Sequence, residues 1–179
     1  IRPILEKKKS TQVLEGAGVK LDRAFGFGDT SQFDPFLLLD DFRNNNPIDY
    51  QKGFPWHPHR GIETITYILK GSVEHKDSLG NSGELSDGDL QWMTAGSGIL
   101  HQEMPKGNNL GQMHGFQLWA NLPSSLKMTT PNYQDVKSSE IKVIKDDDGT
   151  IIKIVIGNYK GYTGVIHGIA SNPQYFDIY

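Results

Sequence analysis

Apolar residues in this chain recur in short runs or at alternate positions, and turn-forming residues separate the runs. This pattern is typical of β-strands, whose side chains point to opposite faces with a period of two. The connecting segments are rich in glycine, asparagine, aspartate and serine, as turns are. No long segment has a helical period, and residues 138–141 are expected to form one helical turn at most. Strands are predicted over residues 11–16, 19–25, 35–42, 62–71, 72–77, 88–95, 98–105 and 114–122.

Many short strands at this spacing predict an all-β fold, built as a sandwich, a barrel or a jelly roll. Residues 123–150 are polar and weakly patterned, which indicates a linker or an excursion from the main fold. Strand-like runs resume in residues 151–179. We therefore expect a main domain over residues 1–135, followed by a linker and the first strands of a second domain over residues 136–179.

Composition narrows the classes of function. Of the 179 residues, 36% are hydrophobic and 22% are charged, as in ordinary globular proteins. The net charge is −3 and the one basic run is Lys7–Lys9, so direct binding to nucleic acid is not expected. No segment approaches the ~20 apolar residues that span a bilayer, and no signal peptide is visible. We expect an intracellular protein without a membrane partner, in the cytoplasm or, in a eukaryote, also in the nucleus. The absence of cysteine excludes disulfides, thiolate ligands and cysteine nucleophiles.

Two histidines separated by one proline, His57 and His59, precede an apolar strand. Pro58 favours an extended backbone before it, and residues two apart on an extended chain point to the same face. Continued alternation puts Glu63 on that face as well, followed by Ile65 and further apolar side chains. We therefore expect the two imidazoles to point into the protein, near the end of a barrel strand.

A second pair of ligand-type residues, His101 and Glu103, lies on another predicted strand. The two share a face with Ile99, so they too are expected to point inward. Neighbouring strands lie ~4.8 Å apart, and four such groups can therefore converge on one metal ion. Neutral imidazoles suit iron, zinc, copper and nickel, and a carboxylate offsets part of the ion's charge. Spacing alone leaves open whether Glu63 or Glu103 completes the site.

The other histidines and the tryptophans have simpler interpretations. His75 falls at a predicted strand end and is expected in a turn or on the surface. His114 shares a face with Phe116, so it is either a partner of the site or a packed core histidine. The tryptophans are expected in the core or in pocket walls: Trp56, Trp92 and Trp119.

Three segments together resemble the pirin family of the cupin superfamily: HPHRGIETITY, DLQWMTAGSGILHQEMP and QLWANLP. The resemblance covers most of residues 15–135. It implies a jelly-roll barrel of the cupin type, a double-stranded β-helix. It also implies two such domains in a complete chain, with a metal in the first domain only. The chain therefore resembles an incomplete pirin that stops soon after its second domain begins.

The same resemblance implies the ligands and the metal. The family's ligands fall on His57, His59, His101 and Glu103, which leaves Glu63 beside the site rather than on the ion. Fe(II) is the usual metal, and zinc, manganese, nickel or copper can substitute for it.

Two functions follow from the resemblance. Pirins of this type are similar to quercetin 2,3-dioxygenases, which open flavonols with O2 and release carbon monoxide. Glu103 would then be the catalytic base, and the substrate a small aromatic molecule such as a flavonol. Eukaryotic pirins also act as iron-dependent co-regulators, in which case the partner would be a transcription factor. A metal-stabilised cupin whose catalysis is incidental is a third interpretation. The sequence leaves open the enzyme activity, the native substrate and the oligomeric state.

Overall fold

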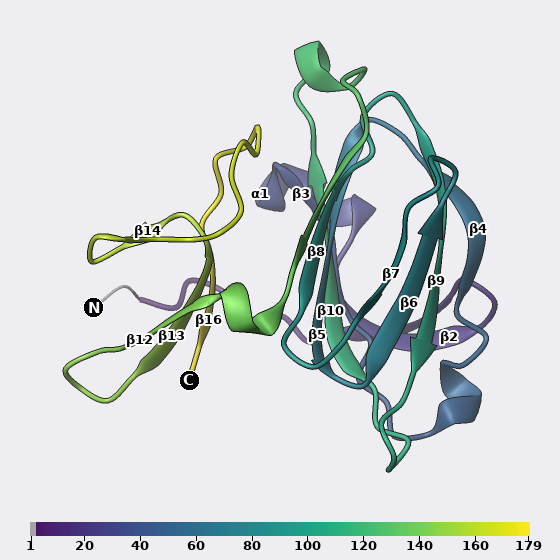
Figure 1. The fold of residues 1–179 in the computed structure, drawn as a ribbon, viewed down its shortest axis with the longest axis horizontal. Coiled ribbons are helices and arrows are strands. Elements are labelled where there is room, and N and C mark those ends of the chain that lie inside the picture. Colours follow the sequence, from purple (N-terminus) through teal and green to yellow (C-terminus); the bar gives the residue numbers. More distant parts are fainter. Residues whose placement is uncertain (1–2) are drawn as a thin grey trace.

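Two antiparallel sheets face each other in the computed structural model, which describes residues 3–179 (Figure 1). The larger sheet runs in the order β1 (Thr11–Glu15), β2 (Val19–Phe25), β3 (Phe36–Asp41), β10 (His114–Asn121), β5 (Ile62–Lys70), β8 (Leu90–Thr94) and β11 (Asn132–Val136). The smaller sheet runs in the order β4 (Phe54–His59), β9 (Ile99–Lys106), β6 (Ser72–Asp77) and β7 (Ser82–Leu85). The all-β expectation is thus confirmed.

A separate small sheet lies against the outer face of the larger one, to the left in Figure 1. It contains β12 (Lys142–Lys145), β13 (Ile151–Ile156) and β16 (Tyr175–Ile178). β14 (Asn158–Tyr159) and β15 (Tyr162–Thr163) form a separate two-stranded ribbon. Within residues 3–179, helical structure is limited to α1 (Thr30–Phe33) and to single 3₁₀ turns at Phe27–Asp29, Pro47–Asp49, Ser124–Leu126 and Ser138–Glu140. The last of these is the one helical turn that the sequence predicts.

Alternation divides the side chains of the larger sheet between two environments. On its outer face, Ile65, Tyr67 and Trp92 pack with Val155 and Ile166 of the C-terminal segment in one buried apolar cluster. On its inner face, the side chains meet those of the smaller sheet, and one end of this interior is filled by a second apolar cluster. Its members are Val19, Leu21, Phe42, Tyr50, Ile68, Val73, Leu85 and Met113.

The polar stretch over residues 123–150 contains a strand that the sequence pattern did not predict. Residues 132–136 form β11, which pairs with β8 along its whole length and buries Val136. The strand escaped prediction because most of its side chains are polar and several serve buried polar groups rather than an apolar core. The C-terminal segment buries part of its apolar surface, because Val155, Ile156 and Ile166 pack on the larger sheet. A domain division at residue 135 stays a prediction.

No helix within residues 3–179 has the length and the apolar character that crossing a membrane requires.

The hydroxyl of Tyr67 ties the larger sheet to the C-terminal sheet, since it donates to Asp177 at 2.6 Å. Tyr67 is 2% exposed, so Tyr67→Phe removes this bond without opening a cavity. Asp177 keeps Tyr179 as a donor, and we expect the free energy of unfolding to fall by only about 1 kcal/mol. Urea denaturation measures this change. Tyr162→Phe, at an exposed position, is the control, and equal midpoints for the two variants would contradict the assigned role.

Candidate metal centre

The pairing of β4 with β9 brings together histidines that are distant in the sequence. His57 lies directly opposite His101, and His59 lies opposite Ile99. The register shifts between Phe54 and His57, so β4 carries a bulge just before its first histidine. Bulges bend a strand and re-aim its side chains, and they are common beside functional sites.

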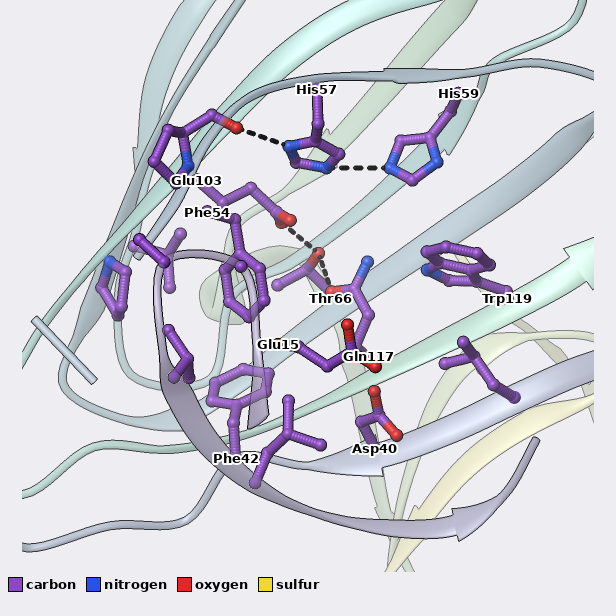
Figure 2. A pocket seen from close by; sticks show the side chains of 18 of the residues that line it. Glu15, Asp40, Phe42, Phe54, His57, His59, Thr66, Glu103, Gln117 and Trp119 are labelled. Carbon is purple, nitrogen blue, oxygen red and sulfur yellow. Dashed lines mark hydrogen bonds between the residues drawn. The ribbon is translucent and has the colours of Figure 1, made fainter. Parts of the chain in front are cut away.

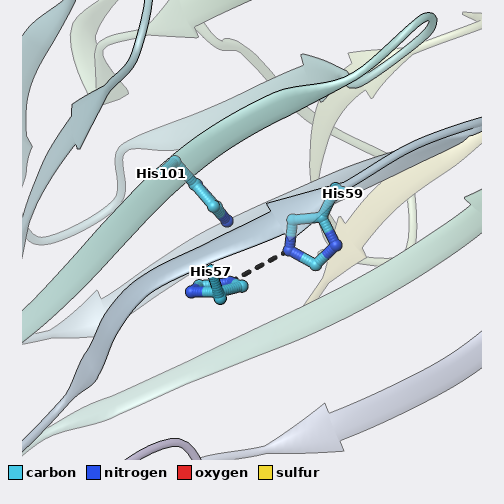
Figure 3. Close-up of side chains that lie close together, drawn as sticks. All are labelled: His57, His59 and His101. Atoms are coloured by element: carbon cyan, nitrogen blue, oxygen red, sulfur yellow. Dashed lines mark hydrogen bonds between the residues drawn. The ribbon is translucent and has the colours of Figure 1, made fainter.

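Three imidazoles converge in the interior as a result (Figure 3). Their ligand-type nitrogens all lie within 4.8 Å of one another: His57, His59 and His101. The ring centroids of His57 and His101 are 4.4 Å apart, and the Nε2 atoms of His57 and His59 are 3.0 Å apart. His59 is 7% exposed and His101 is 1% exposed, so two of the three rings are almost fully removed from water.

The protonation states suit a metal ion. Burial, together with the neighbouring imidazoles, lowers the pKa of His59 and of His101 to about 3, so both rings are neutral at physiological pH. His57 Nδ1 lies 2.8 Å from the carbonyl oxygen of Pro55. Donation of an Nδ1 proton to that carbonyl leaves Nε2 as a free lone pair, the tautomer typical of a metal-bound histidine.

An unsatisfied polar group supports the same assignment. Both ring nitrogens of His101 are buried, and neither has a hydrogen-bond partner among the described residues. An orphaned buried polar group is costly, and a coordinated ion would remove part of that cost. The donor set of neutral imidazole nitrogens therefore fits a divalent transition metal.

Glu103 lies beside this cluster but outside the set of mutually close ligand atoms. It shares the inward face of β9 with His101 and is 7% exposed. Its Oε1 accepts a hydrogen bond from Thr66 Oγ1 at 3.0 Å. The structure thus brings three of the four expected ligands together and holds the fourth carboxylate nearby, turned toward Thr66 (Figure 2).

Glu63 is not on the face that carries the histidines, contrary to the sequence-based interpretation. The chain turns at Gly61, whose φ is +68°, and this turn separates β4 in one sheet from β5 in the other. Alternation therefore cannot be continued from His59 to Glu63. The Glu63 side chain shares the outer face of β5 with Ile65 and accepts a hydrogen bond from Thr94 at 2.9 Å. Thr66, on the opposite face, reaches the site instead.

The expectation for His75 was also wrong, because this residue is 3% exposed. His75 lies on β6, directly opposite Glu103 of β9. Its ring stacks on that of Tyr133, and its Nε2 lies 3.6 Å from Oδ2 of Asp135. Of the tryptophans, Trp92 is in the core and the other two line the cavity beside the histidines. His114 is half-buried, and its Nε2 accepts a hydrogen bond from Arg43 away from the histidine cluster.

A cavity of about 800 Å³ opens beside the histidines. His57, His59 and Glu103 line it, and His101 lies behind them. Most of its other walls are apolar or aromatic, as Figure 2 shows for Phe42, Phe54 and Trp119. Within such walls, the few polar groups that face the cavity determine how a ligand can be oriented.

Several of those polar groups belong to a line of side chains on the inner face of the larger sheet, here called the polar row. The row crosses neighbouring strands at one level, since each member is the cross-strand partner of the next: Arg23, Asp40, Gln117, Thr66, Gln91 and Asp135. Sequence reasoning missed Thr66 and Gln117. The available signal was the alternation within β5 and β10 taken separately, which puts both on the face opposite the apolar cluster of the outer side.

Comparison with known proteins identifies the family of this chain. The pirin family model matches residues 18–120, which is more than half of the sequence. The chain belongs to the pirin family. A pirin-like protein of Caulobacter vibrioides is 46% identical over 99% of this chain, and the match covers 64% of that relative. The chain thus spans less than two thirds of the length of the curated relatives it matches.

Solved structures of pirin-type proteins have the same fold. A crystal structure described as quercetin 2,3-dioxygenase from Acinetobacter baumannii superposes with a TM-score of 0.80 at 36% identity, over 90% of this chain and 58% of that one. A bacterial pirin from Escherichia coli in complex with nickel(II) gives a TM-score of 0.55 at 25% identity, over 81% of this chain and 67% of that one. The cupin jelly roll is therefore confirmed, and the three-histidine cluster has the donor set that a divalent metal ion requires.

Glu63→Gln should stabilise the protein increasingly as pH rises. Burial raises the pKa of Glu63 above its ordinary value of 4.5, so the folded state holds this proton more tightly than the unfolded state does. The carboxyl therefore costs stability as pH rises from about 4.5 through the folded pKa. The difference in unfolding free energy between variant and wild type should grow over this range and then level off. Urea denaturation from pH 4 to 8 measures it, and a constant difference would contradict the assignment.

His101→Ala should lower the affinity for a divalent metal by at least about tenfold, the loss seen even when an outer partner of a metal ligand is removed. Competition with a coloured chelator measures the affinity, and elemental analysis measures the metal content. His167→Ala is the matched control because that histidine is exposed and far from the cluster in the sequence. Unchanged metal binding in the His101 variant would show that the cluster is not the metal site.

Proposed function

We propose that the protein is an iron-dependent dioxygenase that opens the ring of flavonols such as quercetin with O2. The observation that carries this proposal is the convergence of three imidazoles, with a carboxylate beside them, on one wall of a mostly apolar cavity. In the proposal, Fe(II) is held by His57, His59, His101 and Glu103. Similarity to the Acinetobacter baumannii protein described as a quercetin 2,3-dioxygenase supports the reaction class.

The chemistry divides between the ion and the side chains. Bound Fe(II) would supply Lewis-acid attraction for the hydroxyl and keto oxygens of a flavonol, and reactivity toward O2 that side chains lack. Glu103 accepts the proton of the flavonol hydroxyl as a general base. The hydrogen bond from Thr66 holds the Glu103 carboxylate in place for this transfer.

The cavity suits a flat aromatic ligand. Phe27 and Trp56 line it while remaining 62% and 53% exposed, so they form an aromatic rim. Deeper in, the ring of Trp119 lies edge-on to Phe27 at 5.9 Å and to His59 at 4.9 Å between centroids. Aromatic surfaces in such arrangements attract further rings. The volume falls within the range of roughly 300–1,000 Å³ found for small-molecule sites.

Anaerobic loading with Fe(II), followed by addition of quercetin and O2, should give oxygen uptake at an electrode. Glu103→Gln should lower kcat about 100-fold or more, because a neutral amide cannot accept the proton. Glu63→Gln is the matched control, since it changes a buried carboxyl outside the cavity and should keep wild-type turnover. Iron content is measured on every sample. Full iron occupancy with no oxygen uptake would contradict the proposal for quercetin.

A further inference from the structure

Gln117 lies between the two halves of the site. Along β10 it shares the inward face with Trp119, whose ring contacts His59. Across the sheet it is the partner of Thr66, which donates to Glu103. Gln117 thus lies between Trp119, which contacts the histidine cluster, and Thr66, which contacts the carboxylate.

The amide of Gln117 is turned with its oxygen toward Thr66. Its Oε1 accepts a hydrogen bond from Thr66 Oγ1 at 2.8 Å. The partner on its other side, Asp40, is already engaged, because both of its carboxylate oxygens accept hydrogen bonds from Arg23 at 2.8 Å. The amide nitrogen has no hydrogen-bond partner in the described part of the chain, and Figure 2 shows it pointing into the space below His59.

A free donor in a mostly apolar cavity is costly unless a ligand or water uses it. We propose that Gln117 orients the substrate, its amide nitrogen donating a hydrogen bond to the ligand oxygen that lies next to Glu103. This inference rests on the proposed function. Gln117 would be the residue that selects a ligand with an ionisable hydroxyl beside a ring. When Glu103 takes the proton, the O–H bond breaks, a new O–H bond forms on the carboxyl, and the negative charge stays on the ligand oxygen. The amide N–H then faces an anion, where hydrogen bonds are strongest.

A ligand that uses this hydrogen bond must carry a hydroxyl next to its keto group. Quercetin and luteolin differ by one hydroxyl, the one next to the keto group that quercetin has and luteolin lacks. Gln117 should therefore distinguish the two ligands, whereas the apolar walls should treat them alike. Dissociation constants for both are measured anaerobically on the Fe(II)-loaded protein by quenching of tryptophan fluorescence. The red-shifted absorbance of the ionised flavonol reports the charge on the bound ligand.

Gln117→Leu should raise the dissociation constant for quercetin about tenfold and weaken the red-shifted band, while luteolin binding changes by less than about twofold. Gln117→Glu should bind quercetin at least as poorly, because it presents only acceptors. Gln91→Leu is the matched control: it removes an amide from the other neighbour of Thr66, outside the cavity, and should leave the ratio of the two constants unchanged.

The possible results separate the inference from the proposed function. Equal losses for quercetin and luteolin in Gln117→Leu, or wild-type quercetin binding in Gln117→Glu, would overturn the role of Gln117 while leaving a flavonol-binding protein. A general effect of removing an amide beside Thr66 would be evident as a change in the Gln91→Leu control as well. Failure of the iron-loaded wild-type protein to bind quercetin would instead reject the flavonol class, and the inference with it.

Discussion

The antiparallel pairing of β4 with β9 is the constraint on which the site depends. Hydrogen bonding fixes the register of the two strands, and the register puts His57 opposite His101. Because side chains alternate, His59 and Glu103 then point to the same interior. A slip of one residue would turn all of these groups to the opposite face, so the metal site and the backbone pairing cannot vary independently.

The interior of the barrel also has to satisfy its own polar groups. Asp40 is 4% exposed and Gln91 is 2% exposed, and each finds a partner on the neighbouring strand, Arg23 and Asp135 respectively. Cross-strand pairs of this kind satisfy the polar groups at the two ends of the polar row. Thr66, in the middle, has a single proton, and the oxygens of Glu103 and Gln117 compete for it. The row is therefore fully satisfied at its ends and under-satisfied where it meets the cavity.

The sequence predicted the architecture and the histidines because both depend on local patterns. Period-two alternation identified most strands. The inward orientation of the two short motifs with His57 and His101 was predicted correctly because each motif lies within a single strand. The errors arose where a conclusion had to cross a turn. Gly61 moved Glu63 to the other face of its sheet, and His75 is buried because a neighbouring strand carries a glycine, Gly83, where a side chain would clash with its ring. Both effects depend on how the strands pair, which the alternation within one strand does not show.

The groups that remain without partners are the ones from which function is inferred. A folded chain tolerates few buried unsatisfied polar atoms, and those that persist have to be compensated. The ring nitrogens of His101 are orphaned in the protein alone, and a divalent ion that binds only the folded arrangement would offset their cost and stabilise the barrel by mass action. The nitrogen of Gln117 differs because it faces the open cavity, where a ligand can come and go. The buried nitrogens of His101 therefore favour a resident ion, whereas the accessible nitrogen of Gln117 favours an exchangeable substrate.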